Sequence, residues 1–370
     1  MTQAAAASEP DLKAAQPARQ APDTADGVLP GLWYLAACSA DLKPGRMLGK
    51  TLFGAPVLLG RTRDGAAFAL RDLCPHRGVR LSEGRFDGTE IACPFHGWRF
   101  GANGACKRVP SLAPGQQIDL NQIATPAYSV SERQGCIWIK APGADGAAAD
   151  GLKAAPPEIP EIGERAPKVS VSLRFETDMD NAVFGLLDPA HGPYVHQSRL
   201  WRRPDKLADK EKRYAPSDLG FTMLRHPPSS NSVIYKFLGG APTTEISFRL
   251  PGVRLEHVRV GSGHICNFTA MTPIDGARTE VTNLLYWTTP ALDLLTPFIH
   301  AYARRFLGQD QWIIGLQNET KPFAPDTMLI RDADALQRWY LRLKDAWRRA
   351  VREERAFVNP IEPATLRWRT

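Results

Sequence analysis

The hydrophobic positions divide the chain into two parts that differ in periodicity. Between residues 33 and 140, short apolar runs are separated by Gly, Pro and Asp, and clear examples cover residues 56–59, 66–70 and 135–139. Runs of this length with turn residues at both ends predict β-strands. We therefore expect a small all-β domain over residues 30–140.

The second part begins with strands and ends with helices. An alternating segment at residues 169–175 precedes a stretch of mixed helical character at residues 180–196. Further strand-like runs then cover residues 232–237, 244–250, 253–260, 265–271 and 280–288, and helical spacing follows over residues 292–316 and 334–352. Strands followed by helices predict an α+β domain over residues 168–370.

Two segments lack this periodicity. Residues 1–29 are rich in Ala, Pro, Gln and Asp and have no apolar core of a signal peptide, which predicts a disordered tail. Residues 141–167 are rich in Gly, Ala and Pro, which is typical of a linker. The apolar run at residues 291–299 is too short to span a bilayer. We expect a cytoplasmic protein without a membrane segment.

Charge is concentrated in the first domain. The whole chain carries a formal net charge of +7, and residues 28–140 hold 14 Lys and Arg against 8 Asp and Glu, a difference of +6. No stacking motif or groove-reading helix accompanies these cations, so a nucleic-acid partner is not expected. An acidic redox partner is the favoured interpretation, and a merely solvated basic surface is the alternative.

Two Gly- and Pro-marked loops each offer one Cys and one His. Cys74 and His76 lie in the segment CPHRG, and Cys93 and His96 lie in CPFHGW. A Rieske [2Fe–2S] cluster needs this mixture, because two thiolates hold one iron and two imidazoles hold the other. Zinc accepts the same ligands, but zinc fingers usually place both Cys on one knuckle, so we favour the cluster. The remaining cysteines are expected to be small buried apolar residues: Cys38, Cys106, Cys136 and Cys266.

A second group of candidate ligands lies in the segment DPAHGPYVH, which contains Asp188, His191 and His196. Non-haem Fe(II) oxygenases bind iron through two His and one carboxylate and leave other positions open for O₂. Taken alone, Asp188 followed by Pro189 is also an ordinary helix N-cap. We expect the Gly192–Pro193 step to distort the helix locally and help both imidazoles to face one metal.

The third iron ligand is expected to be Asp310. On a helix it shares one face with apolar residues such as Phe306 and Ile314, where a carboxylate is costly unless it is paired or bound to metal. The alternative is a salt bridge to Arg304 or Arg305. Two other acids are poorer candidates: Glu319 and Asp326.

Together these motifs resemble the α subunits of Rieske non-haem iron aromatic-ring-hydroxylating oxygenases, from about Leu32 to the C-terminal helix. By length the resemblance is to the homotrimeric branch, which includes O-demethylases and carbazole dioxygenase. It implies a Rieske β-domain joined to a helix-grip catalytic domain. It also implies a set of metal ligands, with Cys74, His76, Cys93 and His96 on the cluster and His191, His196 and Asp310 on a mononuclear iron.

The resemblance assigns Asp188 a bridging role. This carboxylate would link a cluster histidine, here His96, to an iron-ligand histidine of the neighbouring subunit in a head-to-tail trimer. Many relatives have an Asn three or four residues before this Asp, but here Phe184 and Gly185 occupy those positions and the nearest Asn is Asn181. Val79 and Phe95 also replace the disulfide pair of respiratory Rieske loops, which indicates the lower-potential branch.

The resemblance implies an enzyme that inserts oxygen from O₂ into an aromatic or other apolar small molecule, by hydroxylation or oxidative demethylation. Electrons would come from a separate ferredoxin or reductase, because the GSG at residues 261–263 is not a dinucleotide-binding fingerprint. The alternative is a Rieske electron-transfer protein with a non-catalytic second domain. Several aromatic residues are candidates for a substrate pocket, although most are expected in the core: Phe221, Tyr235, Phe237, Phe248, Tyr286 and Trp287.

Overall fold

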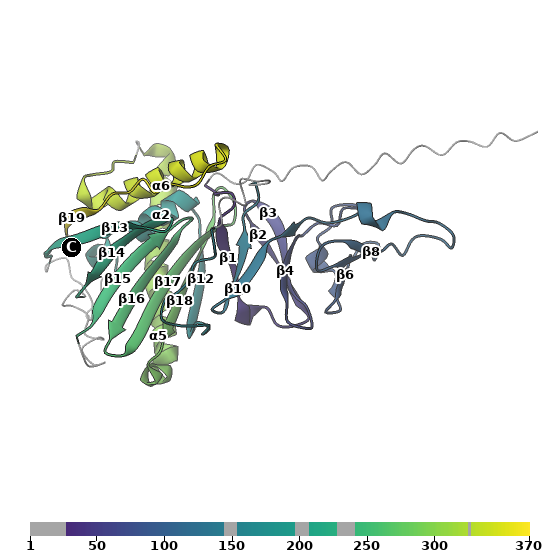
Figure 1. Cartoon of the computed structure of the whole chain (residues 1–370), viewed down its shortest axis with the longest axis horizontal. Helices are drawn as coiled ribbons and strands as arrows, with labels where there is room; N and C mark the ends of the chain where they lie inside the picture. The colour runs from purple at the N-terminus through teal and green to yellow at the C-terminus, as the bar shows by residue number, and fades with distance from the viewer. Residues whose placement is uncertain (1–26, 144–153, 197–206, 228–240, 325–326) are drawn as a thin grey trace, which may run out of the picture.

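The structure is a computed structural model that describes residues 27–143, 154–196, 207–227, 241–324 and 327–370. It is elongated, with the N-terminal β-domain at one end and a large sheet covered by helices at the other (Figure 1). Within the described residues, no helix combines the length and apolarity needed to cross a bilayer.

The N-terminal domain consists of three small sheets. Their strand orders are β1-β11-β10, β2-β3-β4-β9 and β5-β6-β7-β8, and all pairings are antiparallel. The predicted strands at residues 56–59, 66–70 and 135–139 correspond to β3, β4 and β11. The strand bounds are β1 Trp33–Cys38, β2 Arg46–Leu52, β3 Ala55–Arg61, β4 Ala67–Arg71, β5 Arg85–Phe86, β6 Glu90–Ala92, β7 Arg99–Gly101, β8 Cys106–Arg108, β9 Ala127–Tyr128, β10 Val130–Arg133 and β11 Cys136–Lys140.

The folded part begins earlier than the composition indicates. Val28 and Leu29 are buried in the main core, and the Leu29 backbone N–H donates to the Tyr34 hydroxyl at 2.7 Å. The expected tail is therefore wrong at these two residues, because apolar side chains next to β1 pack although the preceding sequence is polar. Residues 1–26 lie outside the described part of the chain.

The second half of the expected linker is anchored rather than free. From residue 154 to 167 it forms no helix or strand, but Ile159 and Ile162 are buried. The Gln134 side chain donates to the Ile159 and Gly163 carbonyls, both at 2.8 Å, and accepts from the Ile159 N–H at 2.8 Å. Residues 144–153 of this segment lie outside the description.

The C-terminal domain is built on an eight-stranded antiparallel sheet in the order β12-β18-β17-β16-β15-β14-β13-β19. Strand β12 (Val169–Phe175) and strand β16 (Val253–Val260) have the predicted bounds, whereas β13, β14 and β19 were not predicted; the expected strand at residues 232–237 lies outside the description. The other strands are β13 Asp209–Ser217, β14 Gly220–His226, β15 Thr243–Arg249, β17 Gly263–Pro273, β18 Thr279–Trp287 and β19 Ala364–Arg369.

Helices complete this α+β domain. The first predicted helix begins four residues late, at Thr296, because residues 290–295 form a 3₁₀ segment. Helix α5 lies along one face of the large sheet, and α6 and α2 cover the same sheet from another side (Figure 1). The helix bounds are α2 Met179–Leu187, α3 Gly192–Val195, α5 Thr296–Thr320 and α6 Ala335–Arg352.

The opposite face of the large sheet packs on the N-terminal domain. Trp138 of β11 contacts Phe268 of β17 edge to face, with ring centroids 6.0 Å apart. The Thr272 hydroxyl donates to the Leu35 carbonyl at 2.7 Å, and Lys50 pairs with Glu280 at 2.5 Å. This contact leaves the helix-covered face of the sheet free to form a cavity.

Candidate metal centres and cavity

The two Cys–His loops of the N-terminal domain have the same backbone design. The Cys74 N–H donates to the Val79 carbonyl at 2.8 Å, and the Cys93 N–H donates to the Trp98 carbonyl at 2.8 Å. Each loop turns at a glycine with positive φ, 72° at Gly78 and 69° at Gly97, a conformation that favours glycine. Two equivalent turns therefore present one Cys and one His each.

The four side chains meet in an asymmetric arrangement. The Cys74 and Cys93 thiols are buried, whereas His76 and His96 are exposed and their rings lie 4.7 Å apart. Burial raises the pKa of Cys74 to about 11, so its thiolate needs a positive charge nearby, which a bound metal supplies. Buried thiols and exposed imidazoles fit the two chemically different irons of a Rieske cluster.

The second centre is formed where α2 ends. Asp188 is the C-terminal cap of α2, not the N-cap that its sequence context also permitted, and its Oδ1 accepts from the Ala190 N–H at 2.7 Å. His191 and His196 then flank the short helix α3, and Asp310 lies in the middle of α5. Two segments more than a hundred residues apart in sequence thus supply one site.

The three predicted ligands converge on one point. The two Nε2 atoms of His191 and His196 are 3.2 Å apart, and Asp310 Oδ1 lies 3.1 Å from His196 Nε2 and 3.6 Å from His191 Nε2. Metal–ligand bonds of about 2 Å place neighbouring ligand atoms about 3 Å apart, so this triangle fits a single ion. Within the described residues, neither Arg304 nor Arg305 forms a salt bridge with Asp310.

The outer nitrogen of each imidazole already has a partner. His191 Nδ1 lies 2.9 Å from the Asp188 carbonyl oxygen, and His196 Nδ1 lies 3.1 Å from Gln309 Oε1. Both contacts suit a protonated Nδ1 and leave Nε2 free to bind a metal. Burial lowers the pKa of His191, which favours the neutral ring. Sequence reasoning missed Gln309, whose only signal was its position beside Asp310.

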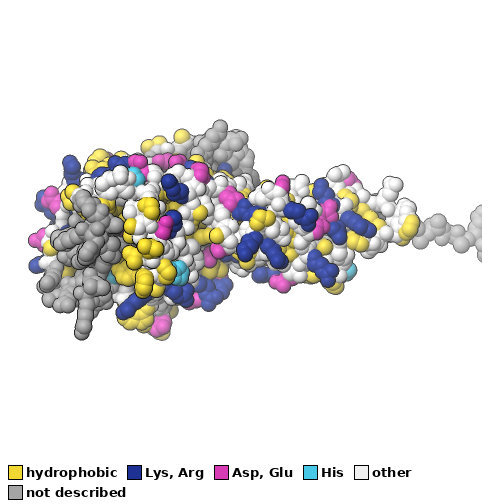
Figure 2. Space-filling view, turned by 90° about the horizontal axis from the view of Figure 1, so that it is seen from below, with side chains coloured by type: hydrophobic (Ala, Val, Ile, Leu, Met, Phe, Trp, Pro, Cys, Tyr) yellow, Lys and Arg dark blue, Asp and Glu magenta, His cyan; other side chains and the backbone are white. Residues whose placement is uncertain are grey.

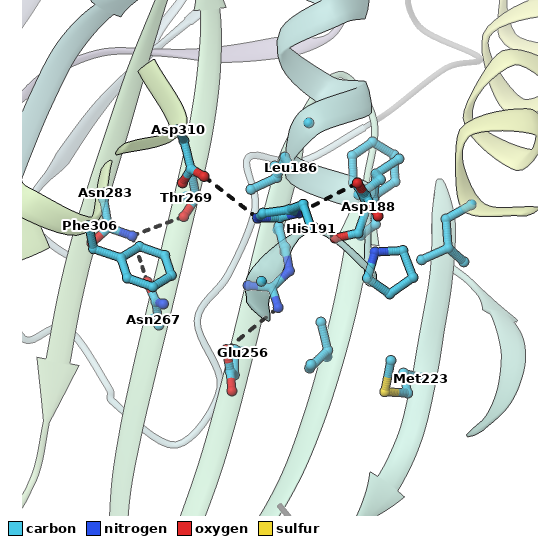
Figure 3. A pocket seen from close by; sticks show the side chains of 18 of the residues that line it. Leu186, Asp188, His191, Met223, Glu256, Asn267, Thr269, Asn283, Phe306 and Asp310 are labelled. Atoms are coloured by element: carbon cyan, nitrogen blue, oxygen red, sulfur yellow. Dashed lines mark hydrogen bonds and ion pairs between the residues drawn. The ribbon is translucent and has the colours of Figure 1, made fainter. Parts of the chain in front are cut away.

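A cavity of about 470 Å³ opens beside this centre, between α5 and the sheet. Figure 3 shows His191, Asp188 and Asp310 on one side and the strand residues Asn267 and Glu256 across from them. The walls are mainly apolar: Phe175, Phe221, Met223, Ile246, Phe248, Leu285 and Phe306.

The structure separates the aromatic candidates for this pocket. Phe221 and Phe248 line the cavity, with stacked rings 5.4 Å apart. All four described candidates are buried in the core, as was expected of most of the set, and Tyr286 and Trp287 do not line the cavity. Tyr235 and Phe237 lie outside the described residues. The four cysteines outside the cluster loops are buried and free, as predicted: Cys38, Cys106, Cys136 and Cys266.

Comparison with known proteins assigns the first domain. Residues 32–128 match the family model of the Rieske [2Fe–2S] domain. The oxygenase component of dicamba O-demethylase from Stenotrophomonas maltophilia is 32% identical over 220 residues, which are 57% of this chain and 60% of that protein. Chlorophyllide a oxygenase from Chlamydomonas reinhardtii is 35% identical over 182 residues, 48% of this chain and 26% of that protein. The chain thus spans less than two thirds of these relatives.

A more distant relative extends over nearly the whole chain. The 4β-methylsterol monooxygenase of Methylococcus capsulatus is 26% identical over 362 residues, which are 91% of this chain and 94% of that protein. Among solved structures, dicamba monooxygenase with dicamba superposes with a TM-score of 0.66 at 22% identity, over 88% of this chain and 98% of that chain. Pseudomonas putida NdmA with caffeine gives 0.67 at 19% identity, over 90% and 95%. Both structural matches show the fold. The chain therefore carries a Rieske [2Fe–2S] domain at residues 32–128 and, across both domains, shares the fold of dicamba monooxygenase and NdmA.

Proposed function

We propose that this chain is the oxygenase component of a Rieske non-haem iron system, acting on an aromatic or other apolar small molecule. The observation that carries the proposal is the meeting of His191 Nε2, His196 Nε2 and Asp310 Oδ1 beside a largely apolar cavity. Two histidines and one carboxylate that open into a cavity are the ligand set of Fe(II) oxygenases. The relatives and structural neighbours named above include monooxygenases and demethylases, which supports the same class.

The roles of the side chains follow from their positions. Cys74, His76, Cys93 and His96 would hold the [2Fe–2S] cluster, which when bound supplies one electron at a time. His191, His196 and Asp310 would hold an iron, which when bound offers open positions to O₂. The Asp188 and Gln309 contacts fix the two imidazoles, and the apolar walls hold the substrate and exclude water.

Electrons must come from a partner protein, and we propose a ferredoxin or a reductase with an acidic docking face. Figure 2 shows Lys and Arg side chains gathered on the visible face of the Rieske domain. Several exposed cations lie in or near the cluster loops: Arg77, Arg80, Lys107 and Arg108. Opposite charge on a partner would speed its association there.

We further propose a cytoplasmic homotrimer in which the cluster of one subunit serves the iron of the next. The strands β6 and β7 that carry the second cluster loop lie at the end of the molecule far from the large sheet (Figure 1). Asp188 lines a second pocket together with Val195, Ile313 and Leu316. We propose that this pocket admits the Rieske domain of a neighbouring subunit. In that arrangement Asp188 would link His96 of one chain to His191 of the next. We place the boundary between the two domains within residues 141–167.

The alternative function, an electron-transfer protein with a passive second domain, leaves the three-ligand centre without a role. Oxygen uptake separates the two functions. With NADH and a surrogate ferredoxin and reductase, a panel of small aromatic compounds should include some that stimulate O₂ consumption and yield hydroxylated or demethylated product. His191→Ala should abolish product formation, whereas His300→Ala, which removes an exposed histidine of α5, should not. Product formation by His191→Ala at the wild-type rate would contradict the proposal.

A further inference from the structure

The cavity floor carries charge that the metal centre does not use. On strand β16, Arg254 and Glu256 lie on the same face of the sheet and both line the cavity. Both side chains face the cavity between the sheet and α5. Leu255, which lies between them in the sequence, and His257, which follows Glu256, are buried on the opposite face of the sheet. A guanidinium in a largely apolar cavity is costly unless its N–H groups have partners.

Arg254 is only weakly paired within the described structure. Its Nη2 lies 3.5 Å from Glu256 Oε2, a long ion pair, and its guanidinium makes no hydrogen bond among the residues described. An arginine offers five N–H donors in a planar fork that fits a carboxylate in bidentate fashion. Most of these donors remain available to a molecule in the cavity.

The surrounding charges have the same sign. Lys210 and Lys212 of β13 also line the cavity, and both are partly buried. Among the side chains of the described lining residues outside the metal centre, three are cations, Arg254, Lys210 and Lys212, and one is a carboxylate, Glu256. The cavity therefore favours a ligand with negative charge.

An aromatic surface adjoins the guanidinium. Phe248 is the direct cross-strand neighbour of Arg254, and Phe221 is the next residue in the same row across the sheet. On the other side of Arg254, the row continues to Thr269 and then Asn283, whose side-chain Nδ2 donates to Asn267 Oδ1 at 2.6 Å and to Thr269 Oγ1 at 2.9 Å. The amide side chains thus bond to one another and make no hydrogen bond to Arg254, so the long ion pair with Glu256 is the contact that its guanidinium makes within the described structure (Figure 3).

We infer that the substrate of this cavity is an apolar molecule with an anionic oxygen group, such as an aryl carboxylate, and that Arg254 binds this group. The inference rests on the proposed function, because it names the substrate class of the same site. The anion would lie on the Arg254 fork, and its apolar body would pack against Phe248 and Phe221. A cavity of about 470 Å³ is in the range of small-molecule sites.

Equilibrium binding to the iron-loaded full-length protein tests the inference without turnover. Isothermal titration calorimetry at low salt would compare naphthalene-2-carboxylate with naphthalene-2-carboxamide, which have the same shape and differ in charge. Naphthalene-2-sulfonate would show whether another anionic oxygen group is accepted. The carboxylate should bind at least about tenfold more tightly than the amide, the usual value of a hydrogen bond to a charged group.

Four variants locate the source of this preference. Arg254→Met should remove it, Arg254→Lys should keep part of it, and Glu256→Gln should tighten carboxylate binding by removing the competing anion. Arg259→Met is the matched control, because Arg259 is on the same strand but exposed and paired with Glu161 rather than facing the cavity. Unchanged iron content and melting temperature would show that each variant is folded.

Three results would overturn the inference. They are equal binding of the amide and the carboxylate, no saturable carboxylate binding to the wild type, and a preference that survives in Arg254→Met. A preference that survives in Arg254→Met would show that the metal or the two lysines, Lys210 and Lys212, bind the carboxylate. A failed oxygenase function is distinguishable, since it would appear as absent O₂ consumption in a protein that still binds carboxylates through Arg254.

Discussion

His191 and His196 direct the same ring nitrogen toward Asp310, because the other nitrogen of each ring lies against an acceptor. For His191 that acceptor is the Asp188 carbonyl, and the Asp188 carboxylate is also close, with Oδ2 3.7 Å from Nδ1. Asp188 therefore acts on the centre through His191 rather than as a ligand of its own. Its proposed contact with a neighbouring subunit would use the same carboxylate.

Asp188→Asn should separate metal binding from electron delivery. The amide keeps the size of the side chain but removes its charge, so cluster and iron content should be retained. Substrate-dependent reoxidation of the reduced cluster, followed by its visible absorbance in stopped flow, should slow by about 10- to 100-fold, the usual effect of losing a group that orients a metal ligand. Reoxidation at the wild-type rate would remove Asp188 from the proposed path.

Each residue of the two proposed ligand sets could be named from the sequence, since each lies in a short motif or on an apolar helical stripe, and their roles as ligands remain predictions. The sequence did not permit the prediction of Gln309 or of Arg254 in the cavity. Arg254 stands in the alternating strand VRLEHVRV, where charged residues usually face solvent. Only the packing of the other face against the N-terminal domain shows that these charges face a cavity.

At the scale of elements, the metal centre depends on how closely α2 and α5 approach. Gly185 of α2 faces Ile314 of α5, and a Cβ at Gly185 would lie 2.7 Å from Ile314 Cδ1. Helix α2 leads into the segment that carries His191 and His196, and α5 carries Asp310, so the separation of the two helices sets the distance between the candidate ligands. The small size of Gly185 therefore has a packing reason in this chain.

Gly185→Val should displace the Ile314 side chain and crowd the contact between the two helices. Overpacking of this kind costs about 1–3 kcal/mol, and we expect iron content to fall more than cluster absorbance, because the cluster loops are in the other domain. Urea unfolding and metal analysis measure the two effects. Gly308→Ala is the control, because nothing lies within 4 Å of a Cβ there, and it should be neutral or stabilising by up to about 1 kcal/mol. A fully stable, iron-loaded Gly185→Val would contradict the close approach.

A buried ion pair ties α2 to α6. Lys344 is 3% exposed and pairs with Asp180, which also accepts from the Tyr340 hydroxyl at 2.7 Å. Asp180→Ala would leave the lysine buried without its counter-ion and should lower the free energy of unfolding by about 3–5 kcal/mol. Chemical denaturation checks this value, and Asp345→Ala, on the exposed side of α6, should change it by less than about 0.5 kcal/mol. Equal effects of the two substitutions would show that the pair contributes nothing.

Strand prediction succeeded where side chains alternate and failed where they do not. Strands β12 and β16 were predicted to the residue because apolar side chains on one face alternate with polar ones on the other. Strand β13 has the sequence DKEKRYAPS, with lysines rather than apolar residues toward the cavity, and gives no such signal. Strand β19 follows the helices and pairs with β13 at the edge of the sheet, which local sequence does not reveal.

At the scale of the whole molecule, the two domains share a buried contact. Leu35, Trp138, Phe268 and Leu284 belong to one apolar cluster that joins β1 and β11 to the large sheet. This contact holds the domains in one orientation, with the second cluster loop at the end of the molecule remote from the large sheet (Figure 1). Electron transfer within one chain is therefore disfavoured, and transfer between subunits is expected.

Mixed oligomers test transfer between subunits. Cys93→Ser should lack the cluster, and His191→Ala should lack the iron, so each variant alone should be inactive. If the two variants are co-expressed and their chains mix at random, about a quarter of the subunit interfaces would join an intact cluster to an intact iron. Activity should return in that proportion. As the control for assembly, wild-type chains would be co-expressed with the Cys93→Ser/His191→Ala double variant, which should lack both the cluster and the iron. Mixtures that stay inactive despite forming oligomers would contradict transfer between subunits.

The most direct test of the two proposed metal centres is the iron and labile-sulfide content of the purified protein, measured together with its EPR spectrum. We expect about three irons and two sulfides per chain, a Rieske signal after reduction, and the loss of one iron but no sulfide in His191→Ala. Two irons in both proteins would show that the His191, His196 and Asp310 centre binds no iron. Zinc without a Rieske signal would contradict the cluster as well.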